Sequence, residues 1–331
     1  FWRYLDGAIS DTRIARGRAL MQQNAALLKR LEAQYGLPGR YLVSFWGMES
    51  DFGRNMGDFS VVRSLATLAY DGRRAALFRG EMFDALTILD RREIDNPHMV
   101  GSWAGAMGQT QFMPSAFLKY AVDQDSDGHR NIWTSTPDAL GSVGNYMKTV
   151  GWEPSRGWGR EVRLPAGFNA ALASLDTDAT ETVKPAAEWN TLGVRRTDGG
   201  PLTAADGPAA LILPAGIHGP AFLVSGNYRM ILKYNHSTFY AIAVAYLADR
   251  LGGAGPLTAP HGSTEPLRRD DILALQQGLS SLGLLPGTPD GIAGTATRQA
   301  VRAFQKANGL PPDGFIDANL LAAVRARSGN A

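Results

Sequence analysis

Residues 45–53, FWGMESDFG, place one glutamate, Glu49, among apolar and small residues. In a helix, the residues three, four and seven positions earlier share a face with a given side chain. For Glu49 these neighbours are Trp46, Phe45 and Leu42. The stretch therefore predicts a helix over about residues 40–50 whose apolar face carries a carboxyl group, with Gly53 placed to end it.

Two interpretations of Glu49 remain open from this pattern. Burying an unpaired carboxylate is costly, so a buried Glu49 would tend to stay protonated, which a general acid requires. Alternatively, Glu49 lies at the edge of the apolar face and forms an ion pair with an arginine such as Arg54. Asp51 lies two residues away on another helical face, so it is a poor candidate for a second catalytic carboxylate.

The composition is that of a globular protein. The chain has 331 residues, of which 44% are hydrophobic and 19% charged, enough for one large domain and a small companion. The net charge of +2 argues against a nucleic-acid partner, and the lack of cysteine excludes disulfides, thiolate metal sites and cysteine nucleophiles. No apolar run approaches the ~20 residues of a membrane span.

The hydrophobic pattern predicts a mainly helical chain with one β-rich segment. Residues 11–35 and 60–95 have helical periodicity, and residues 239–251 return to it after an interruption. The interruption, about residues 158–225, consists of short runs punctuated by Pro and Gly, typical of a small β-rich insertion. The core side chains expected from residues 60–95 are Leu65, Leu68, Leu77, Phe83, Leu86 and Ile88.

A second, smaller unit follows a linker. Residues 252–266 are rich in Gly, Pro, Ser and Thr and have no periodicity, as in an interdomain linker. Helices are then predicted over about residues 270–282 and 295–309, and from Ala318 onward. The core expected of this unit is formed by Leu279, Leu282, Val301, Phe304 and Leu321.

Residues 101–115, GSWAGAMGQTQFMPS, combine small residues with two glutamines. Glycine and alanine let a backbone approach a ligand closely, and the amides of Gln109 and Gln111 can donate and accept hydrogen bonds. Pro114 is placed at the start of the next helix. A glycine-rich loop that only stabilises a turn explains the same pattern, so the segment by itself leaves both interpretations open.

Several motifs together carry a family resemblance. ESDFG, SWAGAMGQTQFMPS, DSDGHRNIW, PDALGSVGNYMKTVGW and YNHSTFYAIAV occur in this order along the chain. They resemble the successive motifs of the membrane-bound lytic transglycosylase B family and its soluble B-type relatives, over about residues 1–251. The resemblance implies a mainly α fold with a lysozyme-like (goose-type) helical catalytic core, which carries one catalytic glutamate, and the small β-rich insertion.

The activity implied by this resemblance is that of a peptidoglycan lytic transglycosylase. Such an enzyme cleaves the β-1,4 bond between N-acetylmuramic acid and N-acetylglucosamine and leaves a 1,6-anhydromuramoyl end. Glu49 matches the family's catalytic residue, acting as acid toward the glycosidic oxygen and then as base toward the C6 hydroxyl of the same sugar. One carboxylate suffices if the substrate's N-acetyl group stabilises the cationic intermediate, and no catalytic cofactor is implied. The alternatives are a hydrolysing muramidase on the same fold and a non-catalytic wall-binding scaffold.

The resemblance also assigns residues to the family's glycan groove: Ser102, Gln111, Tyr146, Tyr234, Asn235 and Tyr240. Arg73 and Arg74 match a pair on the helical addition, where they could meet the carboxylates of stem peptides. Aromatic rings pack against sugar C–H groups, and amides pair with sugar hydroxyls. Each tyrosine is alternatively a partly buried core residue with a hydrogen-bonded hydroxyl group.

The segment DQDSDGHRNIW begins like a calcium-binding loop. Asp123, Asp125 and Asp127, followed by glycine, supply carboxylates at the first, third and fifth positions. His129 would contribute its backbone carbonyl at the seventh position, and its ring would not be a ligand. This opening predicts a structural site for a hard cation.

The end of this loop departs from the standard pattern. Its twelfth position, normally a bidentate glutamate, is Thr134. The family resemblance implies a longer, EF-hand-like loop that is closed by Asp138, which would be a further metal ligand. We expect Ca²⁺ here, with Na⁺, an empty loop and an aspartate cluster that caps the next helix as the alternatives.

The C-terminal unit, residues 267–331, resembles the three-helix peptidoglycan-binding domain of wall-acting enzymes, with PDGIAGTATRQAVRAFQ as its characteristic part. A protein-interaction module and a folding appendage are the alternatives. Together the resemblances imply peptidoglycan glycan strands as the partner, other cell-wall enzymes as further partners, and a location in the periplasm or cell envelope. The first residues, FWRYLDGAIS, lack the features of a signal peptide, so a signal or lipid anchor is not expected within this chain.

Overall fold

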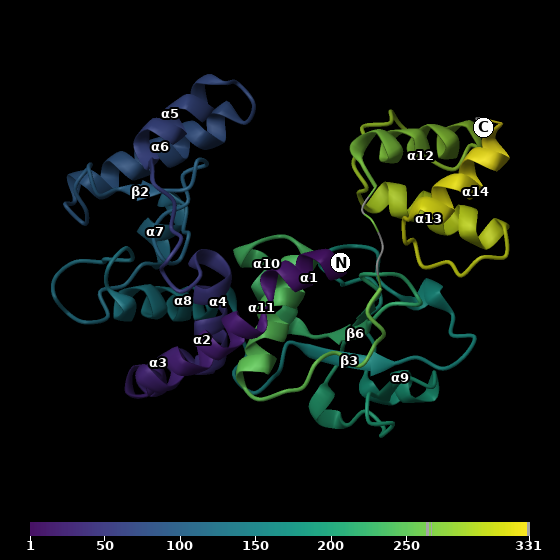
Figure 1. Ribbon diagram of the computed structural model, residues 1–331, viewed down its shortest axis with the longest axis horizontal. Coiled ribbons are helices and arrows are strands. Elements are labelled where there is room, and N and C mark those ends of the chain that lie inside the picture. The colour runs from purple at the N-terminus through teal and green to yellow at the C-terminus, as the bar shows by residue number, and fades with distance from the viewer. Residues whose placement is uncertain (263–264, 266, 330–331) are drawn as a thin grey trace. The chain divides into compact units, whose positions relative to one another are not determined.

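The computed structural model describes residues 1–262, 265 and 267–329 (Figure 1). By their contacts, these residues form two compact units. One, called here the helical unit, comprises residues 8–154 and 242–255; the other, the mixed unit, comprises residues 1–7, 155–241 and the described residues from 256 to 329. Each unit is described by itself.

The helical unit is built almost entirely from helices, as the periodicity predicts. Its only strands among the described residues are two short ones, β1 (Phe59–Ser60) and β2 (Val100–Gly101), which pair antiparallel. Its helices are α2 (Asp11–Gln23), α3 (Ala25–Tyr35), α4 (Gly39–Ser50), α5 (Val61–Tyr70), α6 (Ala75–Asp90), α7 (Pro114–Tyr120), α8 (Thr136–Val150) and most of α11 (Thr238–Leu251). α1 (Trp2–Ala8) precedes them.

The prediction of one continuous helix over residues 11–35 was wrong, because the segment breaks at Asn24. Asn24 ends α2 and begins α3 with φ −101° and ψ 18°, outside the helical region. Its side-chain amide donates to the carbonyl of Leu20 at 2.9 Å. An asparagine side chain that bonds nearby backbone in this way competes with helix continuation.

α4 lies in the core of the helical unit, and the helix predicted for residues 40–50 is confirmed. The hydroxyl of Ser44 donates to the carbonyl of Val244 on α11 at 2.6 Å. The helix ends at Ser50, and the next three residues, Asp51, Phe52 and Gly53, all have positive φ (48°, 62° and 80°). Gly53 is therefore the last of three left-handed residues that turn the chain sharply away from α4.

α5 and α6 form the hairpin seen side by side in Figure 1. Two of its expected core residues, Leu65 and Ile88, are completely buried, and Leu68 is half-buried. The expectation was wrong for Leu77, Phe83 and Leu86, whose exposed fractions are 51%, 57% and 42%. α6 packs mainly against α5 and α7, so much of its surface has no covering layer among the described residues.

The mixed unit contains the predicted β-rich insertion, a four-stranded antiparallel sheet of order β4-β3-β6-β5. Its strands are β3 (Gly159–Arg163), β4 (Arg195–Arg196), β5 (Ala210–Ile212) and β6 (Ala221–Val224), with β3 and β6 in register at Val162 and Ala221. Two helices accompany the sheet: α9 (Ala186–Thr191) and α10 (Gly226–Tyr234).

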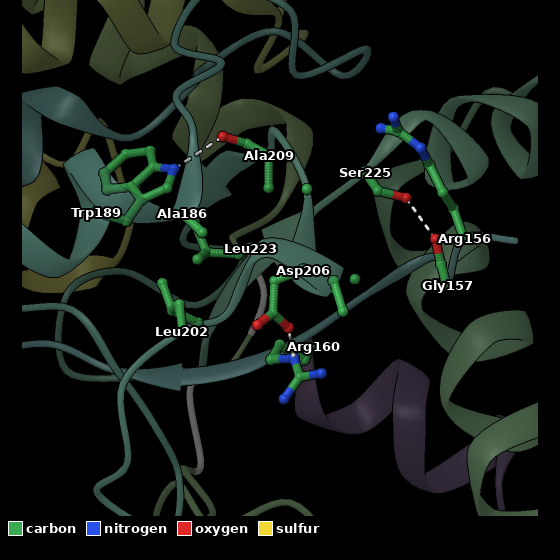
Figure 2. Close-up of a pocket in the computed structure, with 13 residues that line it drawn as sticks. Arg156, Gly157, Arg160, Ala186, Trp189, Leu202, Asp206, Ala209, Leu223 and Ser225 are labelled. Atoms are coloured by element: carbon green, nitrogen blue, oxygen red, sulfur yellow. Dashed lines mark hydrogen bonds and ion pairs between the residues drawn. The ribbon is translucent and has the colours of Figure 1, made fainter.

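A pocket at the edge of this sheet is too small for a sugar ring (Figure 2). Its volume is about 60 Å³, room for a few water molecules. The ion pair between Arg160 and Asp206, at 2.6 Å, lies against it, and the hydroxyl of Ser225 donates to the carbonyl of Gly157 at 2.5 Å. These polar groups satisfy one another, so we interpret the pocket as structural.

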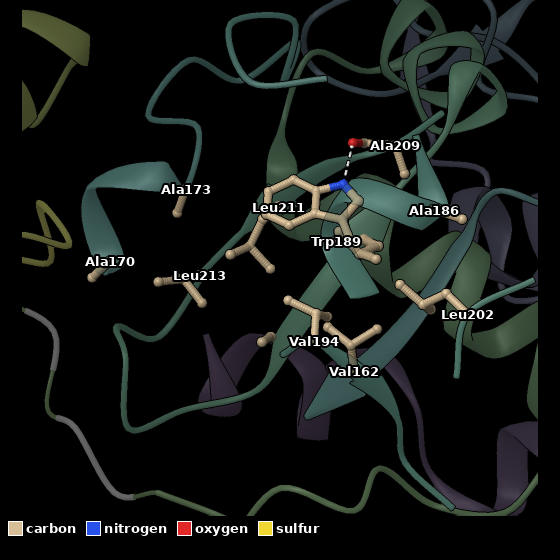
Figure 3. Close-up of a cluster of buried hydrophobic side chains, with 12 residues drawn as sticks. Val162, Ala170, Ala173, Ala186, Trp189, Val194, Leu202, Ala209, Leu211 and Leu213 are labelled. Atoms are coloured by element: carbon tan, nitrogen blue, oxygen red, sulfur yellow. Dashed lines mark hydrogen bonds between the residues drawn. The ribbon is translucent and has the colours of Figure 1, made fainter. Parts of the chain in front are cut away.

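The core of the insertion lies between the sheet and α9 (Figure 3). Trp189 is completely buried there, and its indole N–H donates to the carbonyl of Ala209 at 2.9 Å. Around it pack Val162, Val194, Leu202, Leu211 and Leu213. This apolar cluster packs one face of the sheet against α9.

Three helices complete the mixed unit at the C-terminal end: α12 (Arg269–Ser281), α13 (Thr295–Ala307) and α14 (Ala318–Ser328). Their predicted core is confirmed for Leu279, Val301, Phe304 and Leu321, which are at most 5% exposed, whereas Leu282 is partly buried beside it. This bundle bonds to the insertion: Arg302 donates to the carbonyl of Ala173 at 2.8 Å, and Asp313 accepts from the backbone N–H of Ile217 at 2.9 Å.

The predicted linker is described over residues 252–262 and at residue 265, and its other residues lie outside the described part of the chain. After α11 ends, its described residues form no helix or strand. Two of its backbone N–H groups, those of Thr258 and Ala259, donate to the carboxylate of Glu161 at 2.8 Å. This part of the linker is thus bound to strand β3.

Candidate functional site

Glu49 lies in the last turn of α4 and is half-buried. The neighbours expected on its face, Leu42, Phe45 and Trp46, are at most 5% exposed, which confirms the apolar environment. Arg54, the ion-pair partner considered for Glu49, lies 3.4 Å from the carboxylate of Asp51.

Asp51 has a structural role in the helical unit. Besides Arg54, two arginines of α2 approach its carboxylate, Arg13 at 3.6 Å and Arg16 at 2.9 Å. These ion pairs fasten the end of α4 to α2.

The segment over residues 101–115 is bonded directly to the end of α4 through Gln109, which is only 4% exposed. The indole N–H of Trp46 donates to the amide oxygen of Gln109 at 2.8 Å, and the hydroxyl of Ser50 donates to its backbone carbonyl at 2.8 Å. The amide N–H of Gln109 donates in turn to the carbonyl of Trp133 at 3.2 Å. Trp46, three residues before Glu49, and Ser50, one residue after it, thus both bond to this loop.

Close backbone approach explains Gly57, which lies against the start of this loop. A Cβ on Gly57, whose φ is 83°, would collide with the carbonyl of Gly101 and lie 2.8 Å from the backbone nitrogen of Ser102. The hydroxyl oxygen of Ser102 accepts from the N–H groups of Ala104 at 3.3 Å and Ala106 at 3.0 Å. Because the oxygen accepts twice within the loop, the hydroxyl proton is the part of Ser102 that can reach a ligand.

Gln111 has a different role from Gln109. Its amide N–H groups donate to the carbonyls of Met56 at 3.0 Å and Gly108 at 2.9 Å, so its amide oxygen is the group left to accept from a ligand. Its φ is 50°, a left-handed conformation that costs a non-glycine residue about 1–3 kcal/mol. Such strain is typical of functional loops.

Tyr146, the third groove residue in the helical unit, lies on α8 and is 8% exposed. Its ring centroid is 4.5 Å from that of Tyr120 and 5.8 Å from that of Phe112. Burial, with a smaller effect of Tyr120, raises the pKa of Tyr146 to about 12. Tyr146 is therefore a neutral phenol at any physiological pH, set in an aromatic cluster.

Arg73 and Arg74 lie in the turn between α5 and α6, and both are exposed. They line a cavity of about 370 Å³ together with Phe78 and Trp103. Sequence reasoning missed Trp103, which is 65% exposed and belongs to the same loop as Ser102. An indole that remains exposed beside two guanidinium groups is typical of a binding surface.

The remaining groove residues belong to the mixed unit. Tyr234 ends α10 and is half-buried, Asn235 caps that helix and is exposed, and Tyr240 is 4% exposed in the first turns of α11. The three residues thus surround one connection, from α10 to α11.

The acidic loop brings three carboxylates together. Ligand oxygens of Asp123, Asp125 and Asp127 lie within 4.8 Å of one another. The oxygens of Asp123 also accept from the N–H groups of Asp127 at 3.1 Å and Gly128 at 2.9 Å, and the N–H of His129 donates to Asp127 at 2.9 Å. Hard oxygen donors in a loop folded in this way fit a cation such as Ca²⁺.

Asp138 binds the loop backbone from behind. It is completely buried, and its two oxygens accept from the N–H groups of Gln124 and Asn131, each at 2.7 Å. Burial outweighs these hydrogen bonds and raises the pKa of Asp138 above its usual value. The cap of α8 is the hydroxyl of Ser135, which accepts from the N–H of Asp138 at 3.2 Å, so the first three aspartates do not cap this helix.

Comparison with protein families agrees with this architecture. A model of the transglycosylase SLT domain matches residues 1–249, and a model of a peptidoglycan binding domain matches residues 268–324. The chain belongs to the transglycosylase SLT family. The fold expectation is thus confirmed: a mainly helical, lysozyme-like lytic transglycosylase fold with a small sheet and a C-terminal helical peptidoglycan-binding domain.

Individual members of the transglycosylase SLT family are similar over long stretches. Membrane-bound lytic murein transglycosylase B of Escherichia coli K12 is 34% identical over 254 residues, which are 75% of this chain. The match spans 66% of that relative's length, just under two thirds. The crystal structure of SltB3 from Pseudomonas aeruginosa in complex with NAG-anhNAM-pentapeptide is 46% identical, with a TM-score of 0.93, and the match covers 98% of this chain and 86% of that one. Escherichia coli Slt35 in complex with calcium is 33% identical, with a TM-score of 0.64, over 76% and 78% of the two chains.

Membrane spans are missing from the described residues. None of the helices within residues 1–262, 265 and 267–329 has both the length and the apolar character needed to cross a bilayer.

Proposed function

We propose that the chain is a peptidoglycan lytic transglycosylase that cleaves the MurNAc-β-1,4-GlcNAc bond and leaves 1,6-anhydro-MurNAc ends. The observation that carries this proposal is the setting of Glu49. The residue is half-buried on an apolar helix face, and its neighbours Trp46 and Ser50 hold the loop that contains Ser102 and Gln111. Membership of the transglycosylase SLT family supports the same activity.

In the proposed mechanism Glu49 carries out both proton transfers. The protonated carboxyl group donates to the glycosidic oxygen as the bond from C1 of MurNAc breaks, and the substrate's N-acetyl group stabilises the positive charge at C1. The resulting carboxylate then takes the proton of the C6 hydroxyl, whose oxygen attacks C1 and closes the anhydro ring. The glutamate ends the cycle protonated, and no water is consumed.

The groove residues provide groups that suit a glycan. The hydroxyl of Ser102 can donate and the amide oxygen of Gln111 can accept, since their other hydrogen-bonding groups are engaged within the loop. By the family resemblance, we assign Tyr146 of the helical unit, and Tyr234, Asn235 and Tyr240 of the mixed unit, to glycan binding. Arg73 and Arg74, beside the exposed Trp103, are assigned to the stem peptide, whose carboxylates a guanidinium can bind in a two-pronged manner.

We infer a structural Ca²⁺ site at the acidic loop. The ion would be held by the carboxylates of Asp123, Asp125 and Asp127 and by the backbone carbonyl of His129, and Asp138 would close the loop by binding its backbone. A relative's structure is described as a complex with calcium. The ion would supply charge neutralisation for the three clustered carboxylates and no catalytic step.

The domain assignment follows from the two resemblances. Residues 1–251 would be the catalytic domain, residues 252–266 the linker and residues 267–331 a domain that tethers the enzyme to peptidoglycan. A tether raises the local concentration of substrate without new catalytic contacts. The proposed location is the cell envelope, in the periplasm, with other cell-wall enzymes as further partners.

Digestion of purified sacculi tests this function. Glu49→Gln should lower the release of soluble fragments by about 10²–10⁴-fold. The exposed Glu188→Gln on α9 makes the same chemical change and should leave the rate unaltered. Wild-type rates for Glu49→Gln would refute the role of Glu49, whereas binding of sacculi by the wild type without any release would indicate a scaffold.

A further inference from the structure

A second large cavity lies within the mixed unit and is lined by residues of α1, the first residues of α11 and the C-terminal bundle. Its volume is about 600 Å³, within the range that holds a ligand of a few hundred daltons. Residues from four separate parts of the unit line it, among them Tyr4, Phe239, Arg298 and Phe315. The glycan groove assigned to this chain includes none of the residues that line this cavity.

The cavity contains a guanidinium group that forms no ion pair with a described residue. Arg298, in the first turn of α13, is half-buried, and burial alone lowers the pKa of its guanidinium. Its Nε donates to the backbone carbonyl of Ala293 at 3.4 Å. Among the described residues no carboxylate forms an ion pair with Arg298, although taking a guanidinium out of water without a partner is costly.

A second guanidinium, that of Arg3, lines the same cavity and has no ion pair with a described residue. The one carboxylate among the residues that line the cavity is that of Glu265, which is exposed and forms no ion pair with Arg3 or Arg298. The cavity is therefore net positive.

The rest of the wall is aromatic and aliphatic. The ring of Phe239 packs against those of Phe1 at 5.7 Å and Tyr4 at 6.0 Å, and Phe315 and Ile272 come from the bundle. Aromatic walls bind small apolar groups such as methyl side chains, and a guanidinium fork matches a carboxylate. The complementary ligand is a short peptide with small apolar side chains and a free carboxylate.

We propose that this cavity is a second peptidoglycan subsite, which binds the free C-terminal carboxylate of a stem peptide through Arg298. The proposal rests on the proposed function for its choice of ligand, since a wall enzyme meets such peptides on every uncrosslinked strand. It would let the mixed unit recognise strands by their peptides while the groove near Glu49 recognises their sugars.

The test measures binding of a free stem pentapeptide, without sugars, to the whole chain by isothermal titration calorimetry. Arg298→Gln should weaken binding about 10- to 100-fold, the range for losing hydrogen bonds to a charged group. Arg298→Lys keeps the charge but loses the fork, and should weaken binding by a smaller factor. Arg325→Gln, an exposed arginine on α14, is the matched control and should bind like the wild type.

Two further arms isolate the site. The same pentapeptide with an amidated C-terminus should bind the wild type as weakly as the acid binds Arg298→Gln. The dependence on Arg298 should persist in an Arg73→Gln/Arg74→Gln background, which removes the other proposed peptide contact. Thermal melting of each variant verifies folding.

Three outcomes would overturn the proposal. The first is equal binding of the pentapeptide with a free and with an amidated C-terminus. The others are equal weakening by Arg298→Gln and Arg325→Gln, and unchanged binding in both Arg298 variants. These outcomes are separable from failure of the proposed function. Release of fragments from sacculi by the wild type measures that function, whereas the calorimetry with a sugar-free peptide measures only binding.

Discussion

Replacing Gln109 by methionine should destabilise the helical unit through one identifiable pair, the hydrogen bond from Trp46 to Gln109. The bond is 2.8 Å long, and its residues are 5% and 4% exposed, so water cannot replace either partner. Leaving the indole N–H unpaired costs about 1–3 kcal/mol, and losing the bond to the carbonyl of Trp133 adds about 1 kcal/mol. We therefore expect Gln109→Met to lower the free energy of unfolding by about 2–4 kcal/mol.

The pair can be isolated with a double-mutant cycle. Trp46→Phe removes the donor and leaves the amide oxygen of Gln109 unpaired, whereas in the double variant neither group is left without its partner. The double variant should therefore be less destabilised than the sum of the single variants, by about 1–2 kcal/mol. Urea unfolding followed by far-UV circular dichroism measures this difference, since Trp46→Phe itself alters the fluorescence.

Additive effects, within about 0.3 kcal/mol, would refute the reasoning that this bond joins α4 to the loop. A kinetic readout accompanies the measurement. Because Trp46 shares a helix face with Glu49 and bonds to the side chain of Gln109, Gln109→Met should also lower kcat on sacculi at temperatures where the variant is fully folded.

Three further predictions concern the acidic loop, its neighbour and a glycine. Calcium should raise the Tm of the wild type in a concentration-dependent manner, and a chelator should reverse this rise. The Tm of Asp125→Asn should respond little to calcium. An identical response of the wild type and of Asp125→Asn would contradict the proposed site. Burial opposes ionisation of Glu93, but hydrogen bonds and the charge of Arg130 outweigh it, so its pKa lies below the usual value. The stability that this lowered pKa contributes is present above about pH 4.5 and is lost as the pH falls through the folded-state pKa. Glu93→Gln should therefore be less stable than the wild type at pH 7, and the difference should shrink toward pH 3. A difference that stays constant with pH in urea titrations would contradict this role of Glu93. Gly57→Ala should cost more stability than Gly72→Ala, because both have φ above 80° but only a Cβ at Gly57 meets backbone, and equal losses of Tm would contradict this.

The spacing of apolar residues was sufficient to predict individual helices such as α4. The apolar residues around Glu49 recur at helical spacing, and they define both α4 and the buried face of that helix. The same reasoning failed at Asn24, because the amphipathic pattern continues on both sides of the break and only the side-chain bond to Leu20 reveals it. It also failed for Leu77 and Phe83, since periodicity defines a helix face but not whether another element covers it.

The two glutamines of the loop show where sequence reasoning ends. Both were predicted as amides that could serve a ligand, but the buried side chain of Gln109 bonds within the protein, to partners 63 and 24 residues away in the chain. Gln111 uses its N–H groups internally and keeps its oxygen. Distant partners of this kind leave no trace in residue spacing. The exposed Trp103 was missed because a tryptophan among apolar residues is by default expected to be buried.

The central claim is that the substrate's own C6 hydroxyl, activated by Glu49, attacks C1 in place of water. Digestion of sacculi in water enriched in heavy oxygen, followed by mass spectrometry of the muropeptides, tests it directly. The account predicts products that are lighter by one water than reducing ends and contain no heavy oxygen at C1. Reducing ends labelled at C1 would contradict it and identify a hydrolysing muramidase on the same fold.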